Sequence, residues 1–225
     1  MDDVRLREFL NNLEEGLRGE AREFFKSETF DREQYIFIDQ DEATHLYLVE
    51  EGTVEANIVH GDGKLYILNF LYAGDVFGEG ALYEEGVYSY SAVAREAARV
   101  WRVSWDDLQW LAERDSLFAL YLVRLVVRRL DQAYYKDRCI AGEKVEKRIA
   151  CVLMKMVSEI GVSDKCGLVI DTPLTNRDIA GLVGSTEETV SRIMSRLKKE
   201  EIIASEGKFL VVRDGDALMA YFNGI

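Results

Sequence analysis

Two helix-start signals on either side of a glycine, within residues 175–199, constrain the fold more than any other feature of this chain. Thr175 and Asp178 have the spacing of a capping box, in which a hydroxyl and a carboxylate pair with free backbone N–H groups at a helix start. Ser185 and Glu188 repeat this spacing directly after Gly184. A glycine at this position suits a tight turn between two helices. The segment therefore predicts two short helices joined by a turn.

The second predicted helix has an apolar face and a polar face. Each set of side chains recurs at intervals of three and four residues, as in an amphipathic helix. The apolar set is Val190, Ile193, Met194 and Leu197, and the polar set is Glu188, Ser191, Arg192 and Ser195, followed by Lys198 and Lys199. Two capped helices joined by a tight turn form a helix-turn-helix. An arginine on the polar face can donate two hydrogen bonds to guanine, and a glutamate can accept one from cytosine.

A predicted wing follows the second helix. Residues 202–212 contain two short runs of residues that favour β-strands, one on each side of Gly207. The alternative is a generic helical hairpin with a solvated outer face, but the caps, the turn, the apolar face and the wing all agree, which favours a winged helix-turn-helix that binds DNA. The candidate DNA-binding residues are Thr175, Thr186, Glu188, Ser191, Arg192, Ser195, Lys198 and Lys199.

The N-terminal half has a different pattern, with short runs of Ile, Val, Tyr and Phe separated by glycines between residues 30 and 103. Residues 47–52 and 54–59 predict two strands, and His60-Gly-Asp-Gly63 predicts a hairpin turn. Closely spaced strands of this kind form a roll, a sandwich or a barrel. Residues 4–27 carry spaced apolar side chains and predict a helix before the strands.

Residues 106–138 predict one long helix, whose middle is apolar on more than one side. Such a helix must be covered on most sides. One side can pack on the strands and the other on a copy of itself, while the alternative is an ordinary buried helix in a monomer. Residues 145–160 predict a further helix. We expect an effector domain over residues 1–105, a dimerisation helix over 106–141 and a DNA-binding domain over 142–225.

The net charge of −13 at pH 7 is unusual for a DNA-binding protein, but it is unevenly distributed. Residues 1–143 hold 16 basic and 29 acidic residues, whereas residues 144–225 hold 12 of each. DNA contact needs a local basic face rather than a basic protein. The acidic N-terminal part would be repelled by a phosphate backbone, which leaves the C-terminal part to bind DNA.

The N-terminal segment, the longest apolar run and the cysteines bear on where the protein works in the cell. Residues 1–15 are charged and lack the apolar core of a signal peptide, and the longest apolar run, 117–127, is shorter than the ~20 residues that cross a bilayer. We therefore expect a cytoplasmic protein with no membrane partner. Cys139, Cys151 and Cys166 are odd in number and form no C-x-x-C pair, which predicts free, partly buried thiols rather than a disulfide framework or a zinc site.

Three segments resemble the CRP/FNR family, which contains the cyclic-AMP receptor proteins and the fumarate–nitrate reductase regulators. Gly74-Asp-Val-Phe-Gly-Glu79 and Leu82-Tyr-Glu-Glu-Gly86 resemble the β-roll of the family, and Glu188-Thr-Val-Ser-Arg192 resembles its recognition helix. The resemblance implies an α+β fold with an N-terminal cyclic-nucleotide-binding-like β-roll, a long dimerisation helix and a C-terminal winged helix-turn-helix. It also implies a homodimeric transcription regulator that contacts DNA and RNA polymerase under the control of a small effector.

The pattern E-x-x-S-R matches the FNR branch of the family. The match implies that Glu188, Ser191 and Arg192 recognise a TTGA-type half-site. The cyclic-AMP branch has an arginine where this chain has Glu187, so the outer bases of the site stay open.

The residues that bind cyclic AMP in the other branch are only partly present. That branch binds the phosphate through Gly-Glu and a later Arg-Ser. Gly78 and Glu79 match the first pair and Ser91 matches the serine, but Tyr90 stands in the place of the arginine. Residues 133–134, Ala-Tyr, stand near the place of an adenine-binding Thr-Ser. Because a buried phosphate without a cationic partner is costly, these differences argue against cyclic AMP.

The sequence features that other effectors of the family would need are also incomplete. The N-terminal cysteine cluster of the FNR branch is absent, which argues against an iron–sulfur cluster. His45 and His60 could ligate haem, although a histidine in a hairpin turn is typically solvated. Aromatic side chains around Phe77 could line a pocket for a small apolar ligand or could form the core, so the effector stays unknown. The effector-binding candidates are Gly78, Glu79, Tyr83, Tyr88, Tyr90, Ser91 and Tyr134.

Two other classes of protein fit the sequence less well. A cyclic-nucleotide-gated enzyme or channel would have a kinase motif or a membrane span beside the roll, but a winged helix follows instead. A small-molecule enzyme would need a catalytic triad or a metal cluster, and no His-based arrangement with suitable spacing is present. We therefore expect a protein that is not an enzyme.

Overall fold

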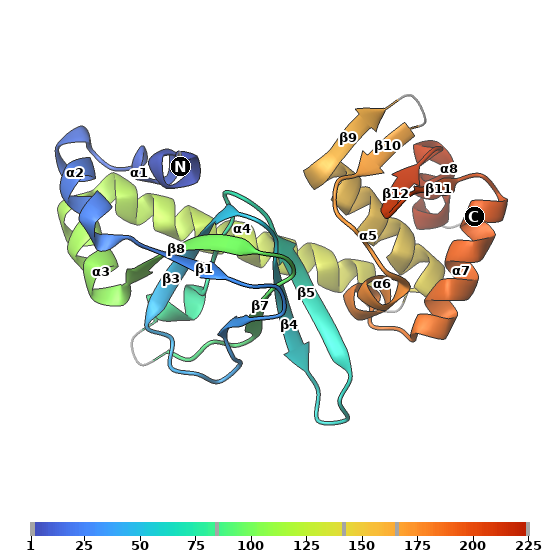
Figure 1. Ribbon diagram of the computed structural model, residues 1–225, viewed down its shortest axis with the longest axis horizontal. Coiled ribbons are helices and arrows are strands. Elements are labelled where there is room, and N and C mark those ends of the chain that lie inside the picture. The colour runs from blue at the N-terminus through green and yellow to red at the C-terminus, as the bar shows by residue number, and fades with distance from the viewer. Residues whose placement is uncertain (1–2, 84–85, 141–142, 165–166, 224–225) are drawn as a thin grey trace. The chain divides into compact units, whose positions relative to one another are not determined.

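A computed structural model describes residues 3–83, 86–140, 143–164 and 167–223. The chain divides into two compact units, Met1–Gln132 and Ala133–Ile225, and a long helix begins in the first unit and ends in the second (Figure 1). Within the described ranges, no helix combines the length and the apolar character that a bilayer span requires. Cys166 and the two glutamates of the Leu82–Gly86 motif lie outside the described residues.

The first unit opens with two helices, α1 (Val4–Leu10) and α2 (Glu15–Phe24), so the single helix predicted over residues 4–27 is wrong. The chain turns between them because Leu13 is buried in the core and the backbone N–H of Glu14 donates to the carboxylate of Asp115, at 2.7 Å. Strand β1 already begins at Lys26.

Eight strands then form a roll of two antiparallel four-stranded sheets. The first sheet has the order β1 (Lys26–Phe30), β8 (Ala98–Ser104), β3 (His45–Glu51), β6 (Val76–Phe77), and the second has the order β2 (Tyr35–Phe37), β7 (Ser91–Ala94), β4 (Val54–Val59), β5 (Leu65–Leu71). The two predicted strands and the hairpin turn after them are confirmed. Gly63 closes this turn with a φ of +78°.

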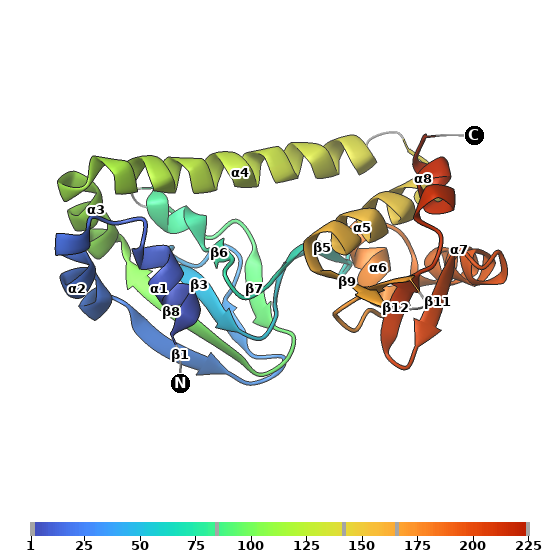
Figure 2. The ribbon, with the colours of Figure 1, turned by 90° about the horizontal axis from the view of Figure 1, so that it is seen from above.

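The first sheet packs against other elements on both faces, mainly through its middle strands β3 and β8. Its inner face meets the second sheet in a core that contains Phe37, Tyr47, Phe77, Tyr88 and Tyr90. Its outer face packs on α1, α3 and α4 through a second cluster, which includes Leu48, Trp101, Leu111, Phe118 and Leu122. Figure 2 shows α4 along one side of the roll.

The long helix predicted over residues 106–138 is broken, and this prediction is wrong. The structure has α3 (Trp105–Arg114) and α4 (Ser116–Ile140) instead. Asp115 lies between them and is 2% exposed. Its carboxylate accepts hydrogen bonds from the backbone N–H groups of Leu117 and Phe118, both at 3.0 Å, and from the N–H of Glu14. The carboxylate therefore caps the start of α4 and holds the turn before α2.

The second unit is a winged helix-turn-helix. Its elements are α5 (Val145–Ile160), β9 (Gly161–Asp164), β10 (Gly167–Ile170), α6 (Asn176–Val183), α7 (Glu187–Lys199), β11 (Ile203–Glu206), β12 (Phe209–Val212) and α8 (Gly215–Asn223). The strands form one sheet in the order β11-β12-β10-β9. The helix predicted over residues 145–160 is confirmed, and α5 packs against α6, α7 and α8.

A disulfide joins Cys139 to Cys151, so the prediction of free thiols is wrong for these two residues. Rules based on spacing look for cysteines that are close in sequence. Here the partners are 12 residues apart, and the packing of the end of α4 on α5 brings their Cα atoms to 6.4 Å.

Candidate nucleic-acid interface

The first helix of the motif, α6, begins with the predicted capping box. The Oγ1 atom of Thr175 accepts a hydrogen bond from the Asp178 N–H at 3.1 Å, and an Asp178 carboxylate oxygen accepts one from the Thr175 N–H at 2.8 Å. The helix ends at Gly184, whose left-handed φ of 61° turns the chain toward α7. Both the cap and the turn are as predicted from the sequence.

The cap of the second helix, α7, is shifted by one residue from the prediction. The N-cap is Thr186, whose Oγ1 accepts from the Thr189 N–H at 3.3 Å, so the predicted Ser185–Glu188 box is wrong. The side chain of Glu188 lies in the first turn, is exposed and takes no part in this cap. A carboxylate in the first turn is favoured by the helix dipole.

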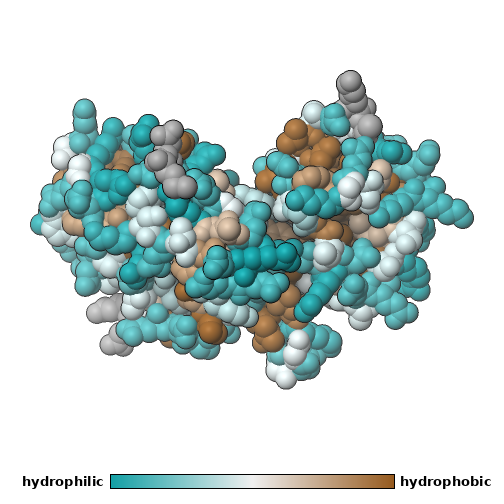
Figure 3. All heavy atoms as spheres, viewed as in Figure 1, coloured by the Kyte–Doolittle hydropathy of each residue, from teal (hydrophilic) through white to brown (hydrophobic). Residues whose placement is uncertain are grey.

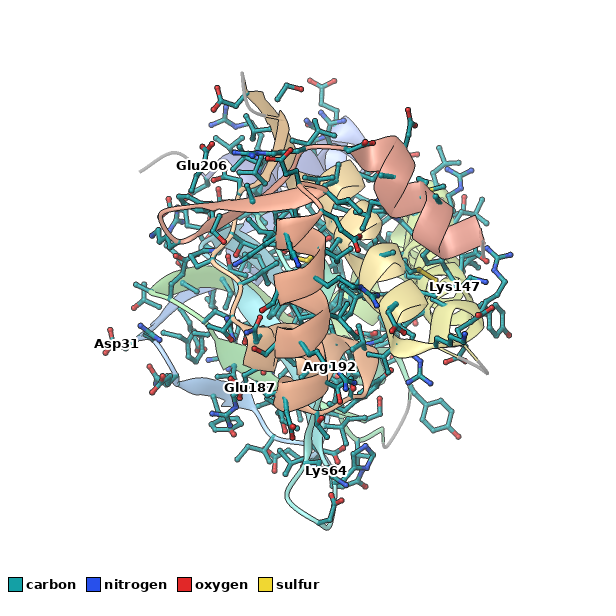
Figure 4. The ribbon with its side chains drawn as sticks, turned by 90° about the vertical axis from the view of Figure 1, so that its right-hand side faces the viewer. Asp31, Lys64, Lys147, Glu187, Arg192 and Glu206 are labelled. Carbon is teal, nitrogen blue, oxygen red and sulfur yellow. A yellow bond between two sulfur atoms is a disulfide. The ribbon has the colours of Figure 1, made fainter. Side chains whose placement is uncertain are left out.

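The apolar face of α7 is buried as predicted, and its polar face lies on the surface (Figure 4). Val190, Ile193, Met194 and Leu197 are at most 4% exposed. Glu188, Arg192, Ser195, Lys198 and Lys199 are exposed, as are Thr175 and Thr186, and Ser191 is half-buried. The predicted polar residues of α7 therefore share one largely exposed face of that helix, whereas Thr175 lies at the start of α6. Arg196 of the same helix instead pairs with Glu146 of α5, at 3.6 Å.

The wing adds residues that the sequence analysis missed. Strands β11 and β12 pair antiparallel and turn at Gly207, whose φ is +61°. A groove of about 280 Å³ lies between the wing, the start of α6 and the end of α7. It is lined by Pro173, Thr175, Asn176, Lys198, Ser205 and Lys208, among others. Two lysines and several hydroxyl or amide groups around one groove suit a phosphate oxygen. The position of Lys208 next to the wing glycine was the signal for this residue.

In the first unit, Gly78, Glu79 and Tyr90 form one hydrogen-bonded group. The phenol oxygen of Tyr90 accepts from the Gly78 N–H at 2.9 Å, and its O–H donates to Glu79 at 2.8 Å. Burial raises the pKa of Tyr90 well above its ordinary value, and the nearby charge of Glu79 adds to this shift. The phenol therefore keeps its proton and acts as the donor.

The other effector-binding candidates are not all brought together. Ser91 is buried, and its Oγ accepts from the Asp39 N–H at 3.0 Å. Tyr88 stacks on Phe37 with 3.7 Å between the ring centroids, inside the core of the roll. Tyr83 is 76% exposed, and Tyr134 belongs to the second unit.

Arg129 connects α4 to this part of the roll and was missed by the sequence analysis. Its Nη2 donates to the carbonyl oxygen of Val76 at 2.7 Å, and its Nε lies 3.9 Å from Glu79. A small cavity of about 60 Å³ lies beside it and is lined by Val76, Glu79, Leu125, Arg128, Arg129 and Gln132, among others. An arginine within an apolar helix was the only sequence signal for this contact.

Neither histidine lies in a set of metal-binding side chains. Nδ1 of His45 is 2.8 Å from the hydroxyl of Thr44, and burial, with the nearby charge of Arg102, lowers the pKa of His45. His60 is exposed in the hairpin turn. Within the described part of the chain, His, Cys, Asp and Glu side chains form no group of three or more that could hold a metal ion.

The surface has a hydrophilic face on the first unit, and α7 carries opposite charges at its two ends. Hydrophilic residues cover most of the face of the first unit that Figure 3 shows. The last turn of α7 carries the basic residues Arg196, Lys198 and Lys199, and its first turn carries Glu187 and Glu188.

Two family models match different parts of the chain. The model of the cyclic nucleotide-binding domain matches residues 27–115, and the model of the Crp-like helix-turn-helix domain matches residues 147–221. The cyclic AMP receptor protein of Thermus thermophilus is 31% identical over 183 residues, which cover 81% of this chain and 82% of that protein. A CRP-like cAMP-activated global transcriptional regulator of Mycobacterium tuberculosis is 26% identical over 84% of each chain.

Solved structures agree with these matches. The structure of FixK2 from Bradyrhizobium japonicum superposes with a TM-score of 0.80 and 25% identity, over 89% of this chain and 98% of that chain. A CRP-family transcriptional regulator from Thermus thermophilus, TTHB099, superposes with a TM-score of 0.75 and 26% identity, over 88% of this chain and 97% of that one.

Proposed function

Because the chain belongs to the CRP/FNR family of transcription regulators, we propose that it binds an inverted-repeat DNA site as a homodimer and that a small effector controls this binding. The chain is a transcription regulator with a helix-turn-helix DNA-binding domain, and its relatives are regulators rather than enzymes. The proposal adds the recognised bases, the dimer interface and the kind of effector, together with RNA polymerase as a partner in the cytoplasm.

The exposed polar face of α7 is the observation that carries the proposed DNA site. Glu188 and Arg192 are four residues apart, which makes them neighbours on one helix face. Arg192 can donate to O6 and N7 of a guanine, and Glu188 can accept from N4 of a cytosine on the other strand. These contacts fit a TTGA-type half-site. Thr175, Thr186, Ser191, Ser195, Lys198 and Lys199 are proposed to contact the backbone and the flanking bases.

The proposed dimer forms along α4. Large apolar side chains form a contiguous exposed patch on this helix. Such a patch indicates an interaction surface. The side chains of the patch are Leu117, Leu120, Val123, Val126, Val127, Leu130 and Tyr134, each at least 42% exposed. A second copy of the same stripe can cover them in a two-fold symmetric interface. Such a dimer would present its two recognition helices to successive major grooves, about 34 Å apart.

The proposed effector is a molecule other than cyclic AMP, although several relatives are named for that nucleotide. The hydroxyl of Tyr90 uses the N–H of Gly78 and the carboxylate of Glu79, and no arginine follows in β7 to pair with a phosphate. A buried phosphate at this place would lack an arginine from β7, and Arg129 of α4 already contacts Glu79 and the carbonyl oxygen of Val76. The effector is proposed to act near Gly78, Glu79, Tyr90 and Ser91 of the first unit. Tyr83, Tyr88 and Tyr134 are left out of this site because they are exposed, packed inside the core of the roll and part of the second unit, respectively.

Selection of binding sites from random double-stranded DNA tests the proposed function directly. The purified full-length protein should enrich an inverted repeat with TTGA-type half-sites. Failure to enrich any sequence, in a protein that is folded and dimeric by light scattering, would contradict the proposal. A separate experiment, mass spectrometry of small molecules retained by the protein through purification, would identify candidates for the effector.

A further inference from the structure

The Cys139–Cys151 disulfide occupies a distinctive place in the fold. Cys139 lies in the last turn of α4, and Cys151 lies in the second turn of α5. Their side chains are 7% and 3% exposed. The Cα separation of 6.4 Å is within the range that a disulfide spans without displacement of the backbone. The bond therefore joins two helices that already pack together.

Two further observations show that the last turns of α4 lie against α5. The sulfur of Cys151 is 3.5 Å from the hydroxyl of Tyr135, one turn before Cys139. Burial, together with the charge of Lys155 on α5, lowers the pKa of Lys136 to about 7. Cys139 and Tyr135, one turn apart on α4, therefore both face Cys151 of α5.

The disulfide also bypasses the connection between these two helices. In sequence, α4 and α5 are joined only by residues 141–144. α4 carries the apolar stripe that we assign to the dimer, and α5 supports α6 and α7. A covalent bond between the two helices restricts how α5 can move on the end of α4, whereas the reduced chain has only the short connection.

Chemistry favours a reversible bond here. A protein that binds DNA works in the compartment that holds the DNA, where glutathione and thioredoxin keep most thiols reduced. Disulfides that persist there are usually transient and regulatory. The thiolate is the form that undergoes exchange, so each cysteine of a reduced pair can attack a small disulfide once it loses its proton.

We propose that Cys139 and Cys151 form a reversible redox couple that fastens the end of α4 to α5 when oxidised and releases it when reduced, and that DNA affinity follows this state. The oxidant is a low-molecular-weight disulfide such as oxidised glutathione. One cysteine thiolate attacks it, forms a mixed disulfide and expels one thiolate. The second cysteine thiolate then attacks the protein sulfur and expels the other. The protein loses two protons and two electrons, and the reagent becomes two thiols.

The redox couple is tested first by chemistry on the full-length protein. The protein is equilibrated in glutathione buffers of graded redox ratio, its thiols are alkylated, and its peptides are analysed by mass spectrometry. The Cys139 and Cys151 peptides should be linked under oxidising conditions and alkylated under reducing ones, in both directions of titration. The Cys166→Ser variant should behave in the same way. A preferred disulfide to Cys166, a link between subunits, or thiols that stay alkylated throughout would overturn the proposal.

The effect on DNA rests on the proposed function and is measured separately. Fluorescence anisotropy on the DNA selected from random sequence should give dissociation constants that differ about fivefold or more between the oxidised and reduced protein. The Cys139→Ser/Cys151→Ser double variant should lose this difference, and Cys166→Ser should keep it. Equal affinity in both states, or a difference that survives in the double variant, would overturn the regulatory role.

The two proposals fail in distinguishable ways. If neither redox state bound DNA, both the proposed function and the regulatory role would be contradicted. Mass spectrometry of the alkylated peptides would still show whether Cys139 and Cys151 form a reversible disulfide. Hydrogen exchange of the α4 end and of α5 gives a further measure that needs neither DNA nor a variant. The amide groups of residues 133–140 should exchange faster in the reduced protein, and unchanged exchange would contradict the fastening role.

Discussion

The hydroxyl of Tyr90 donates a hydrogen bond to the carboxylate of Glu79 at 2.8 Å. This bond links the residue directly before β7 to the short helical turn at residues 79–82. The same oxygen accepts from the N–H of Gly78, so a single side chain satisfies two polar groups beneath α4. Glu79 also lies 3.9 Å from Arg129 on α4. Through these contacts Tyr90 stabilises the part of the roll on which the middle of α4 rests.

Replacement of Tyr90 by Phe should lower the stability of the first unit. The ring stays in the core, but the buried N–H of Gly78 and the carboxylate of Glu79 lose their shared partner. An unsatisfied buried donor costs about 1–3 kcal/mol, so the free energy of unfolding in urea should fall by that amount. Tyr35→Phe removes a hydroxyl from a ring that is 48% exposed and should change stability little. Equal stability of the two variants would contradict the role assigned to Tyr90.

The same arrangement predicts a weak response to cyclic AMP. Tyr90 stands where the resemblance to the cyclic-AMP branch leads us to expect an arginine for the phosphate. Calorimetric titration of the purified protein with cyclic AMP should therefore give no measurable heat of binding at micromolar protein concentration. Tight binding would overturn the proposal that the effector is another molecule.

The carboxylate of Asp115 should make stability depend on pH. Its hydrogen bonds from backbone N–H groups, above all that of Glu14, lower its pKa below the ordinary value of 3.8. The folded chain therefore keeps this carboxylate ionised where the unfolded chain would protonate it. The resulting stabilisation is present above pH 3.8 and is lost as pH falls through the lowered pKa. Unfolding monitored by circular dichroism at several acidic pH values measures this loss.

An Asp115→Asn variant isolates that contribution. The amide can keep part of the geometry but not the charge, so the variant should be less stable at neutral pH, by about 1.5–3 kcal/mol if the charged hydrogen bonds have their usual strength. Its stability should also fall less steeply below pH 4 than that of the unmodified protein. Asp106→Asn, an exposed position in α3, serves as the control. An identical acid profile for both variants would contradict the assignment.

The dimer is best tested at Val123. This side chain is 56% exposed on the apolar stripe of α4, so a glutamate there should leave the monomer folded but place a charge inside the proposed interface. Val59 is also 56% exposed, at the end of β4, and Val59→Glu makes the same chemical change away from the stripe. Light scattering should find Val123→Glu monomeric and Val59→Glu dimeric. Leu122 is unsuitable because it is buried against the roll, where a charge would unfold the first unit.

A stable monomer for the unmodified protein at micromolar concentration would contradict the dimer. A dimer that survives Val123→Glu would instead place the interface elsewhere. Loss of DNA binding together with loss of the dimer would support the two-fold arrangement, since each half-site alone is bound more weakly.

The sequence predicted the elements whose signals are local. The capping box at Thr175, the turn at Gly184 and the buried face of α7 depend on residues a few positions apart, and the structure has all three. The cap of α7 was misplaced by one residue because Ser185 and Thr186 are both good capping residues and only the backbone path decides between them.

The features that the sequence could not predict depend on distant partners. The helical pattern is interrupted at Asp115, whose carboxylate accepts a hydrogen bond from the backbone N–H of Glu14, 101 residues away in sequence. Arg129 reaches the carbonyl of Val76 across 53 residues. The Cys139–Cys151 pair follows from the packing of two helices and not from any spacing motif. In each case the contact depends on a partner that a local sequence pattern does not identify, so the pattern could not predict it.

The two recognition residues lead to the sharpest prediction about DNA. If Arg192 donates to a guanine, Arg192→Ala should cost about 1–3 kcal/mol per half-site and relax the preference at that base pair. If Glu188 accepts from the cytosine, Glu188→Ala should relax the preference at a different position. Arg32→Ala removes a charge from an arginine in the first unit, 75% exposed, and should leave the selected sequence unchanged.

The lysines at the edge of the groove should behave differently from these two residues. Lys198 and Lys208 line the groove beside the wing, where a phosphate and not a base edge is the expected partner. Replacement of either by Ala should therefore weaken all DNA sequences alike and reduce the slope of log affinity against log salt by about 1. Site selection and salt titration of the same variants distinguish the two roles. A relaxed base preference for Lys198→Ala, or an unchanged preference for Arg192→Ala, would mean that the recognition face of α7 is assigned incorrectly.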